Sequence, residues 1–253
     1  MKSFVPSLLL AELSLTIILT SCSVKEGRGQ CPATLLLAIQ GNDLVSGPVC
    51  VRTISPEGRA ETRLLDPTLD GQTHRIPVSR RPFILAASNH SLDDGRWTIP
   101  EGEDCPEVYS CRRKIQVSDE EAFFEVRMQK DFCRMRISLS SPQEGLSMRL
   151  RGRFCGFTLE GTPLEGMFLS WVKEDWCCNV PRQGDNSLML DIFSDSRKGI
   201  ERSFALGEYL REAGYDWQER DLQDVSVLVD YVKSKAVIST AFWTYTISLD
   251  ITL

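Results

Sequence analysis

Residues 133–139 read Cys-Arg-Met-Arg-Ile-Ser-Leu, an uninterrupted alternation of apolar and polar side chains. Because successive side chains of a β-strand point to opposite faces, this alternation predicts a strand with one buried face and one solvated face. The same pattern recurs at residues 124–128, 146–151, 188–192 and 225–231, and again from Trp243 to Leu253. The sequence therefore predicts an all-β fold.

Shorter strands are expected in the first half of the chain, separated by turn residues. Residues 55–58, Ser-Pro-Glu-Gly, favour a hairpin turn because proline presets φ and glycine accepts a positive φ. Residues 91–110 are rich in Asp, Gly, Glu and Pro and are expected to form a long exposed loop, which a Cys105–Cys111 bridge would staple. The expected strands span residues 34–39, 49–54, 60–65, 73–78, 82–87 and 113–117.

One short helix is expected where Leu206, Tyr209, Leu210 and Ala213 share a face and Gly214 can end the turn. A polar segment at residues 118–121 precedes a cleaner strand alternation and suggests a break between domains. Many short strands with little helix indicate two β-sandwich domains. We place them at residues 31–118 and 119–253, with the helix in the second.

The amino terminus has the pattern of a secretory signal: a basic start, an apolar stretch interrupted by Glu12, and then Leu19-Thr20-Ser21-Cys22. That order resembles a lipobox. The apolar stretch is short for the roughly 30 Å hydrocarbon layer of a bilayer. We therefore expect a lipoprotein signal peptide at residues 1–21, lipidation of Cys22, and a tether at residues 22–30. A plain signal peptide or a single transmembrane anchor are the alternatives.

Eight cysteines remain besides Cys22, in a chain expected to leave the reducing cytoplasm, so disulfides are permitted. The spacing does not define the pairing, and a buried free thiol is the alternative for each residue. No C-x-x-C pair is present, which argues against a zinc site. The eight are Cys31, Cys50, Cys105, Cys111, Cys133, Cys155, Cys177 and Cys178.

Charge and motif content argue against several classes of function. The net charge of −6 supplies no basic field for nucleic acid. His74 and His90 lack a partner motif, and no nucleophile elbow or phosphate-binding loop appears, so we expect no catalytic residue and no cofactor. Calcium binding would use the acidic loop residues Asp93, Asp94, Glu101, Glu103 and Asp104. Sugar stacking would use exposed members of the set Trp97, Trp171, Trp176, Trp217 and Trp243.

Several motifs together resemble the FimB-like, anchor-type fimbrillins of Bacteroidota, over essentially the whole mature chain. They are the lipobox, Cys31-Pro32, Gly102–Pro106, and in order Leu206–Leu210, Gly214–Trp217, Asp221–Val225 and Val229–Tyr231. The resemblance implies two stacked transthyretin-like β-sandwiches, lipid-anchored in the outer membrane at the base of a fimbria, without a catalytic residue.

The resemblance also implies partners. Fimbrillin stalk subunits would bind by β-strand complementation, in which an added strand supplies backbone hydrogen bonds and alternating apolar side chains. Two other functions stay open from the residues alone: a surface lipoprotein that binds glycans through Trp171 or Trp176, and a hydrolase that uses an unrecognised pair of carboxylates.

Overall fold

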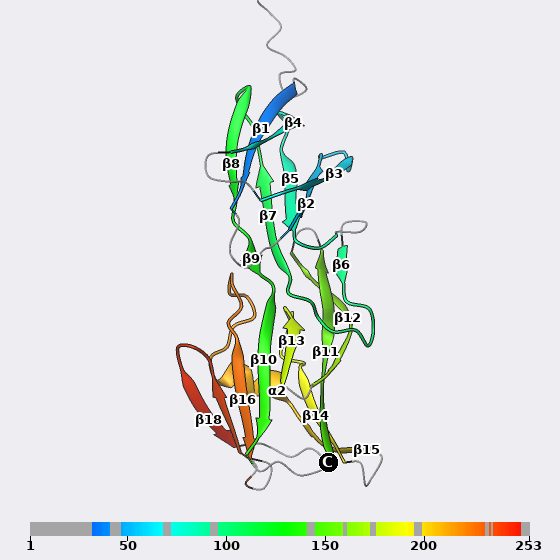
Figure 1. Cartoon of the computed structure of the whole chain (residues 1–253), viewed down its shortest axis with the longest axis vertical. Helices are drawn as coiled ribbons and strands as arrows, with labels where there is room; N and C mark the ends of the chain where they lie inside the picture. Colours follow the sequence, from blue (N-terminus) through cyan, green and yellow to red (C-terminus); the bar gives the residue numbers. More distant parts are fainter. Residues whose placement is uncertain are drawn as a thin grey trace, which may run out of the picture.

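The computed structural model describes residues 32–40, 47–67, 72–91, 96–140, 145–158, 161–172, 176–194, 199–230, 233 and 235–248. These residues form an elongated all-β molecule with one helix, in which two β-sandwiches follow each other along the long axis (Figure 1). The expected all-β fold is confirmed. Cys22 and Cys31 lie outside the described residues.

The amino-terminal sandwich packs a three-stranded sheet against a five-stranded sheet. The three-stranded sheet has the order β4 (His74–Ser79), β1 (Pro32–Ile39) and β8 (Glu121–Val126). The five-stranded sheet has the order β3 (Ala60–Leu65), β2 (Val49–Ile54), β5 (Phe83–Ser88), β7 (Tyr109–Ile115) and β9 (Gln129–Lys130).

The carboxy-terminal sandwich also consists of two sheets. One has the order β13 (Cys177–Pro181), β10 (Phe132–Leu139), β16 (Val225–Asp230), β17 (Lys235–Ser239) and β18 (Thr244–Ser248). The other has the order β12 (Pro163–Trp171), β11 (Leu146–Thr158), β14 (Met189–Ser194) and β15 (Gly199–Phe204), and β6 (Arg96–Thr98) also pairs with β11. The helix α2 (Leu206–Glu212) follows β15.

The alternation at residues 133–139 has the predicted consequence. In β10, Cys133, Met135 and Ile137 are fully buried, whereas Arg134 and Arg136 are exposed. The hairpin turn at residues 55–58 is also confirmed: the Gly58 amide donates to the Ser55 carbonyl at 2.9 Å, and Gly58 has a φ of 82°. Local sequence was sufficient for both features because each depends on neighbouring residues.

The predicted helix is confirmed as α2, whose buried side includes Leu206, Tyr209 and Leu210. Gly214 follows it with a φ of 86°, and its amide donates to the Arg211 carbonyl at 2.9 Å. This left-handed residue ends the helix because glycine has no Cβ to clash in that conformation.

The expected division at residue 118 stays a prediction, and the strand pairing favours a later boundary. Strand β8 pairs in parallel with β1, from Thr34 opposite Glu121 to Ile39 opposite Val126, and β9 pairs with β7. Residues 119–130 therefore belong to the sheets of the first sandwich, and we propose a boundary at Asp131. Alternation identifies a strand, but it does not reveal which distant strand is its partner.

Part of the segment at residues 91–110 is buried, so the prediction of a long exposed loop was wrong. Strand β6 pairs with β11 of the second sandwich, and Trp97, Ile99, Cys105 and Val108 are buried. A Cβ on Gly156 of β11 would collide with the Trp97 carbonyl, so glycine permits this close approach of the two backbones. Residues 96–110 thus contact both sandwiches, although residues 101–104 are exposed.

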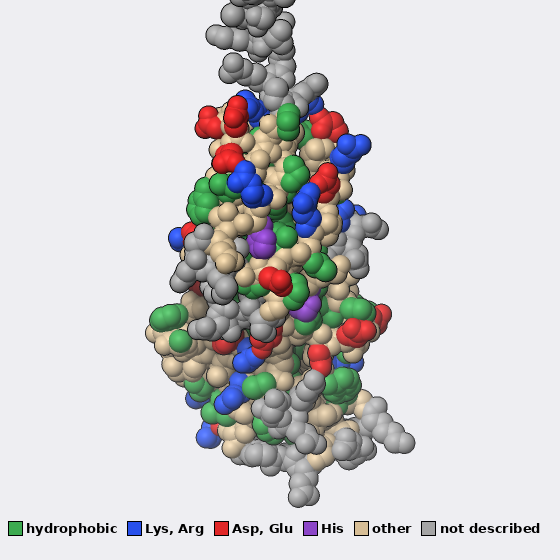
Figure 2. Space-filling view, turned by 45° about the horizontal axis from the view of Figure 1, so that its top comes forward, with side chains coloured by type: hydrophobic (Ala, Val, Ile, Leu, Met, Phe, Trp, Pro, Cys, Tyr) green, Lys and Arg blue, Asp and Glu red, His purple; other side chains and the backbone are tan. Residues whose placement is uncertain are grey.

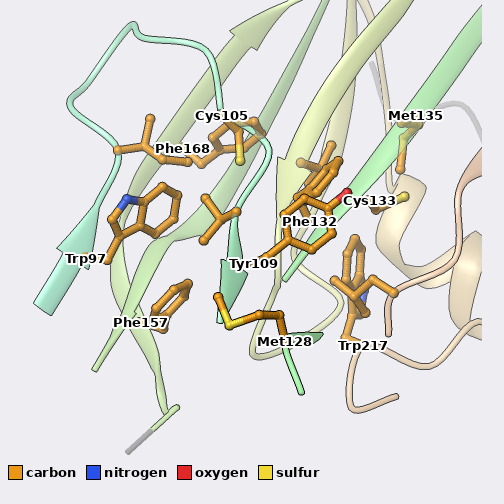
Figure 3. Close-up of a cluster of buried hydrophobic side chains, with 14 of the residues drawn as sticks. Trp97, Cys105, Tyr109, Met128, Phe132, Cys133, Met135, Phe157, Phe168 and Trp217 are labelled. Carbon is orange, nitrogen blue, oxygen red and sulfur yellow. The ribbon is translucent and has the colours of Figure 1, made fainter. Parts of the chain in front are cut away.

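Aromatic side chains make the hydrophobic core continuous across the junction (Figure 3). Trp97 stacks on Phe157 with ring centroids 5.1 Å apart. Tyr109 of the first sandwich meets Phe132 of the second edge to face, at 5.5 Å. Such aromatic pairs bury large areas and add directional preference to the packing.

A buried ionic group, here called the junction cluster, lies in the same region. The Asp131 carboxylate is fully buried and accepts hydrogen bonds from Arg182 at 3.1 Å, from Arg112 at 3.2 Å, from Gln129 at 3.2 Å, and from Ser110. Ser110 and Arg112 belong to β7 of the first sandwich, whereas Arg182 follows β13 of the second. The junction cluster therefore connects both sandwiches.

Candidate assembly interface

The first sandwich has an open groove beside β4, because its three-stranded sheet faces a sheet of five strands. A hollow of about 770 Å³ lies between β4 and the β2–β3 hairpin. Phe83 and Val78 contribute apolar surface to it, and Phe83 is almost completely buried. Its lining residues are Thr53, Ser55, Glu57, Arg59, Glu61, Pro77, Val78, Ser79, Arg81 and Phe83.

Strand β4 is an edge strand along this groove. It pairs with β1 on one side, with Ile76 opposite Leu35 and Val78 opposite Ala33, and no described strand pairs with its other side. An edge of this kind leaves backbone N–H and C=O groups available to another strand. Pro77 agrees with an edge position, because proline has no amide hydrogen to contribute to a central ladder.

Charged side chains surround the groove. Arg81 forms an ion pair with Glu57. A hydrogen bond with its own backbone, together with contacts from Ser55 and Arg81, lowers the pKa of Glu57 below its ordinary value. Figure 2 shows Lys and Arg intermingled with Asp and Glu on this part of the molecule, with apolar patches between them. The groove thus combines apolar surface with a rim of both charges.

A second edge, β18, lies in the other sandwich. Tyr245 pairs with Ile238 and Ile247 with Ala236, so these side chains share the core face of their sheet. Tyr245 is nevertheless 43% exposed, and the neighbouring Phe242 is 80% exposed. Residues 244–248 complete their own sheet, whereas residues 249–253 lie outside the described part of the chain.

No protein-family model and no curated protein matches the sequence. Solved structures match the fold. The fimbrial anchor protein Mfa2 from Porphyromonas gingivalis has a TM-score of 0.58 at 11% identity, over 85% of this chain and 99% of that one. An adhesin candidate from Bacteroides thetaiotaomicron has a TM-score of 0.58 at 13% identity, over 85% and 97% of the two chains. The chain shares its fold with these solved structures.

An adhesin candidate from Bacteroides ovatus agrees, with a TM-score of 0.57 at 11% identity over 86% of this chain and 95% of that one. At these identities the similarity concerns the fold, and it confirms the β-sandwich fold that the resemblance implied. These neighbours are described as adhesin and fimbrial proteins, not as enzymes. Within the described residues, no helix combines the length and apolar character needed to cross a bilayer.

Seven cysteines are described, and Cys50, Cys105, Cys111, Cys133 and Cys155 are free thiols in this structure. Cys105 and Cys111, which the sequence suggested as a staple, are separate. Burial raises the pKa of the Cys133 thiol to about 12, although a hydrogen bond with Tyr215 opposes this shift. Disulfide formation among the cysteines stays a prediction.

The tryptophans divide into two groups. Trp97 and Trp217 are buried and Trp243 is half-buried, whereas Trp171 and Trp176 reach solvent. Trp176 has a φ of 61°, which is uncommon for a residue with a side chain, and its carbonyl accepts from the Ile137 amide at 2.8 Å. The two tryptophans named for sugar stacking are thus the two that are exposed.

The histidines and the acidic loop residues are not brought together. The His74 ring contacts the Asp66 carbonyl at 2.8 Å, and His90 lies 6.2 Å from the Trp97 ring. Glu101, Glu103 and Asp104 are exposed, while Asp93 and Asp94 lie outside the described residues. In the part of the chain that the structure describes, no group of three or more His, Cys, Asp or Glu side chains could hold a metal ion.

Sequence reasoning missed the groove and the junction cluster. Pro77 was the available signal for the groove, since proline within a strand favours an edge. Asp131 and Arg182 offered no local signal, because they lie far apart in the sequence and meet only when β10 and β13 pair.

Proposed function

We propose that this chain is a non-enzymatic lipoprotein of the outer membrane, lipidated on Cys22, that anchors or forms part of a fimbria. It binds a fimbrillin subunit by β-strand complementation, and the receiving element is the groove beside β4. The observation that carries the proposal is this groove, with an unpaired strand edge and apolar surface, within a fimbrillin-like fold.

An extended strand is the occupant that the groove favours. The free edge of β4 offers backbone donors and acceptors, which a strand satisfies along its whole length. Alternate side chains of the added strand would face Val78 and Phe83, while the others would face solvent. Glu57 and Arg81 at the rim supply polar partners for these outward residues.

The position of the groove suits a fimbrial base. Strand β4 pairs directly with β1, and β1 begins at Pro32, shortly after the expected tether at residues 22–30. In Figure 1, β1 and β4 lie at one end of the long axis, and the second sandwich lies at the other. A subunit bound along β4 would therefore be held near the lipid-anchored end.

Recovery of a fimbrillin from detergent-solubilised membranes tests this proposal. Val78→Glu places a charge in the groove and is expected to abolish recovery of the fimbrillin subunit. Thr62→Glu, on the exposed outward side of β3, is the control and should leave recovery unchanged. Equal recovery with both variants would contradict binding at β4, and monomer alone, with normal filaments in a deletion strain, would refute the fimbrial role.

The lipid attachment has a separate test. Cys22→Ala removes the thiol that would carry the thioether-linked lipid, so the protein is expected to move from the membrane fraction into the medium. Incorporation of a labelled fatty acid should disappear in the same variant. Retention in the membrane after this change would contradict lipidation at Cys22.

A further inference from the structure

An aromatic pair with one exposed member lies on the outer face of the β12–β11–β14–β15 sheet. Trp171 of β12 is 47% exposed, and its ring centroid lies 5.1 Å from that of Phe193 on β14. The Arg149 guanidinium carbon is 4.7 Å from the Phe193 centroid and 5.6 Å from the Trp171 centroid. These cation–π contacts hold the indole in place while it presents apolar surface to solvent.

A fully buried carboxylate fixes two arginines beside this pair. Arg149 and Arg151 both donate to Oδ2 of Asp191 at 2.9 Å, and the Ser203 hydroxyl donates to Oδ1 at 2.6 Å. Burial alone raises the pKa of Asp191, but the hydrogen bonds from Ser203, Arg149 and Arg151 lower it further than burial raises it. Asp191 is therefore ionised at neutral pH, and it orients both guanidinium groups.

The cluster retains one excess positive charge, since two guanidinium groups face one carboxylate. Arg151 is 44% exposed and donates to Asp191 through Nε. No other described residue accepts a hydrogen bond from its two Nη atoms. Paired guanidinium N–H groups match the two oxygens of a carboxylate. A ligand carboxylate can thus bind Arg151 without displacing Asp191.

The spacing of these groups fits a single sugar ring. Trp171 is directly opposite Arg149 in the β11–β12 ladder, and Arg151 lies two residues further along the same face. Two residues of a strand span roughly 7 Å. We propose that Trp171, Arg149 and Arg151 form a binding site for a carboxylate-bearing saccharide, whose ring stacks on Trp171 and whose carboxylate binds Arg151.

A saccharide is favoured over an acidic peptide because the site lies on the face of a sheet. A peptide in extended conformation binds along an edge, where backbone hydrogen bonds are available. The strands that carry Arg149 and Phe193 are interior strands with partners on both sides, and Trp171 alone lies on an edge strand, β12. Flat stacking on an exposed ring, together with one charged anchor, requires neither a groove nor a free edge.

The proposed saccharide site lies near one end of the second sandwich. The register of β11 and β14 brings Leu146 opposite Ser194, and Arg149 and Phe193 lie close to that end of the sheet. In Figure 1 this is the end of the second sandwich furthest from the start of β1. This separation from the expected tether makes the proposed saccharide site independent of the groove beside β4.

Binding of a galacturonic acid trisaccharide to the full-length protein in detergent, measured by titration calorimetry, tests the proposal. The matched galactose trisaccharide is the uncharged comparison and should bind at least roughly tenfold more weakly, because it cannot engage Arg151. Trp171→Ala and Arg151→Gln should each weaken binding of the acidic trisaccharide by roughly tenfold or more. Circular dichroism melting curves establish that both variants fold.

Two control variants lie elsewhere in the same sandwich, one directly before β13 and one in β10. Trp176→Ala removes the other exposed tryptophan, and Arg136→Ala removes an exposed arginine on β10; both should bind the acidic trisaccharide normally. Equal binding of the neutral and acidic trisaccharides would overturn the role of Arg151. No binding of either trisaccharide would overturn the site. Preferential binding of a polyglutamate peptide, unchanged by Trp171→Ala, would overturn the choice of ligand.

Discussion

Replacement of Arg182 with methionine tests how the two sandwiches are joined. The Arg182 guanidinium, which is 9% exposed, donates to Asp131 at 3.1 Å. It also donates to the backbone carbonyls of Trp217 at 2.5 Å and Glu219 at 2.7 Å. Methionine preserves much of the side-chain length but donates no hydrogen bond. Asp131 therefore loses one of its two cations, and buried carbonyls lose their donor.

The expected cost follows from these contacts. Removal of one partner from a buried ion pair lowers the free energy of unfolding by about 3–5 kcal/mol, because the remaining charge stays buried. Unsatisfied carbonyls add about 1–3 kcal/mol, whereas Arg112 still donates to Asp131 at 3.2 Å and offsets part of the loss. We expect a net loss of about 4 kcal/mol, which corresponds to a decrease in Tm of roughly 8–16 °C.

Urea unfolding of the mature protein, followed by tryptophan fluorescence, measures this loss. Arg127→Met is the matched control, because Arg127 forms an exposed ion pair with Glu125 at 3.1 Å. An exposed pair of this kind contributes at most about 1 kcal/mol. If Arg182→Met costs no more than the control, the junction cluster does not hold the sandwiches together and the argument from its burial is wrong.

Three further outcomes are expected. Gly156→Ala should lower the free energy of unfolding by about 1–3 kcal/mol, because its Cβ would collide with the Trp97 carbonyl and separate β6 from β11; a neutral effect in thermal melting would contradict this close approach. Asp191→Asn should destabilise the protein at pH 7. The pKa of Asp191 is lower in the folded protein than its ordinary value of 3.8, so its ionised form stabilises the folded protein above pH 3.8. This stabilisation is lost as the pH falls through the folded pKa, so the free energies of unfolding of the native protein and the Asp191→Asn variant should converge in acid. A difference between the two free energies of unfolding that stays constant down to pH 2 would exclude this linkage. Cys133 should resist iodoacetamide in the folded protein, since burial raises its pKa to about 12 and leaves little thiolate, and should react after unfolding; fast labelling of the native protein, located by peptide mapping, would contradict its burial.

The alternation of apolar and polar residues predicted the strands that have one buried face. The segments at residues 49–54 and 60–65 form β2 and β3 with the expected bounds, and the turn at residues 55–58 joins them. The strands without clean alternation were missed: β12 (Pro163–Trp171), β13 (Cys177–Pro181), β15 (Gly199–Phe204) and β17 (Lys235–Ser239). Three of these strands, β12, β13 and β15, lie at sheet edges, where partial exposure on both faces weakens the period-two signal.

The candidate sites were predictable only in part. Trp171 could be named from sequence as a residue for sugar stacking, but its neighbours Arg149, Arg151 and Asp191 could not. Arginine and aspartate on the polar face of a strand normally indicate that this face is exposed to solvent. The full burial of Asp191 instead depends on side chains contributed by β11, β14 and β15.

The sequence by itself determined that this protein is built from strands, where its one described helix ends, and which face of β10 is buried. Each of these follows from interactions between residues close together in the chain, so alternation and a single glycine were sufficient. Only the tertiary structure decided that β8 joins β1, that β4 borders an open groove, and that Arg182 meets Asp131. Those features depend on pairings between distant segments, which form because the two sandwiches bury their apolar faces together.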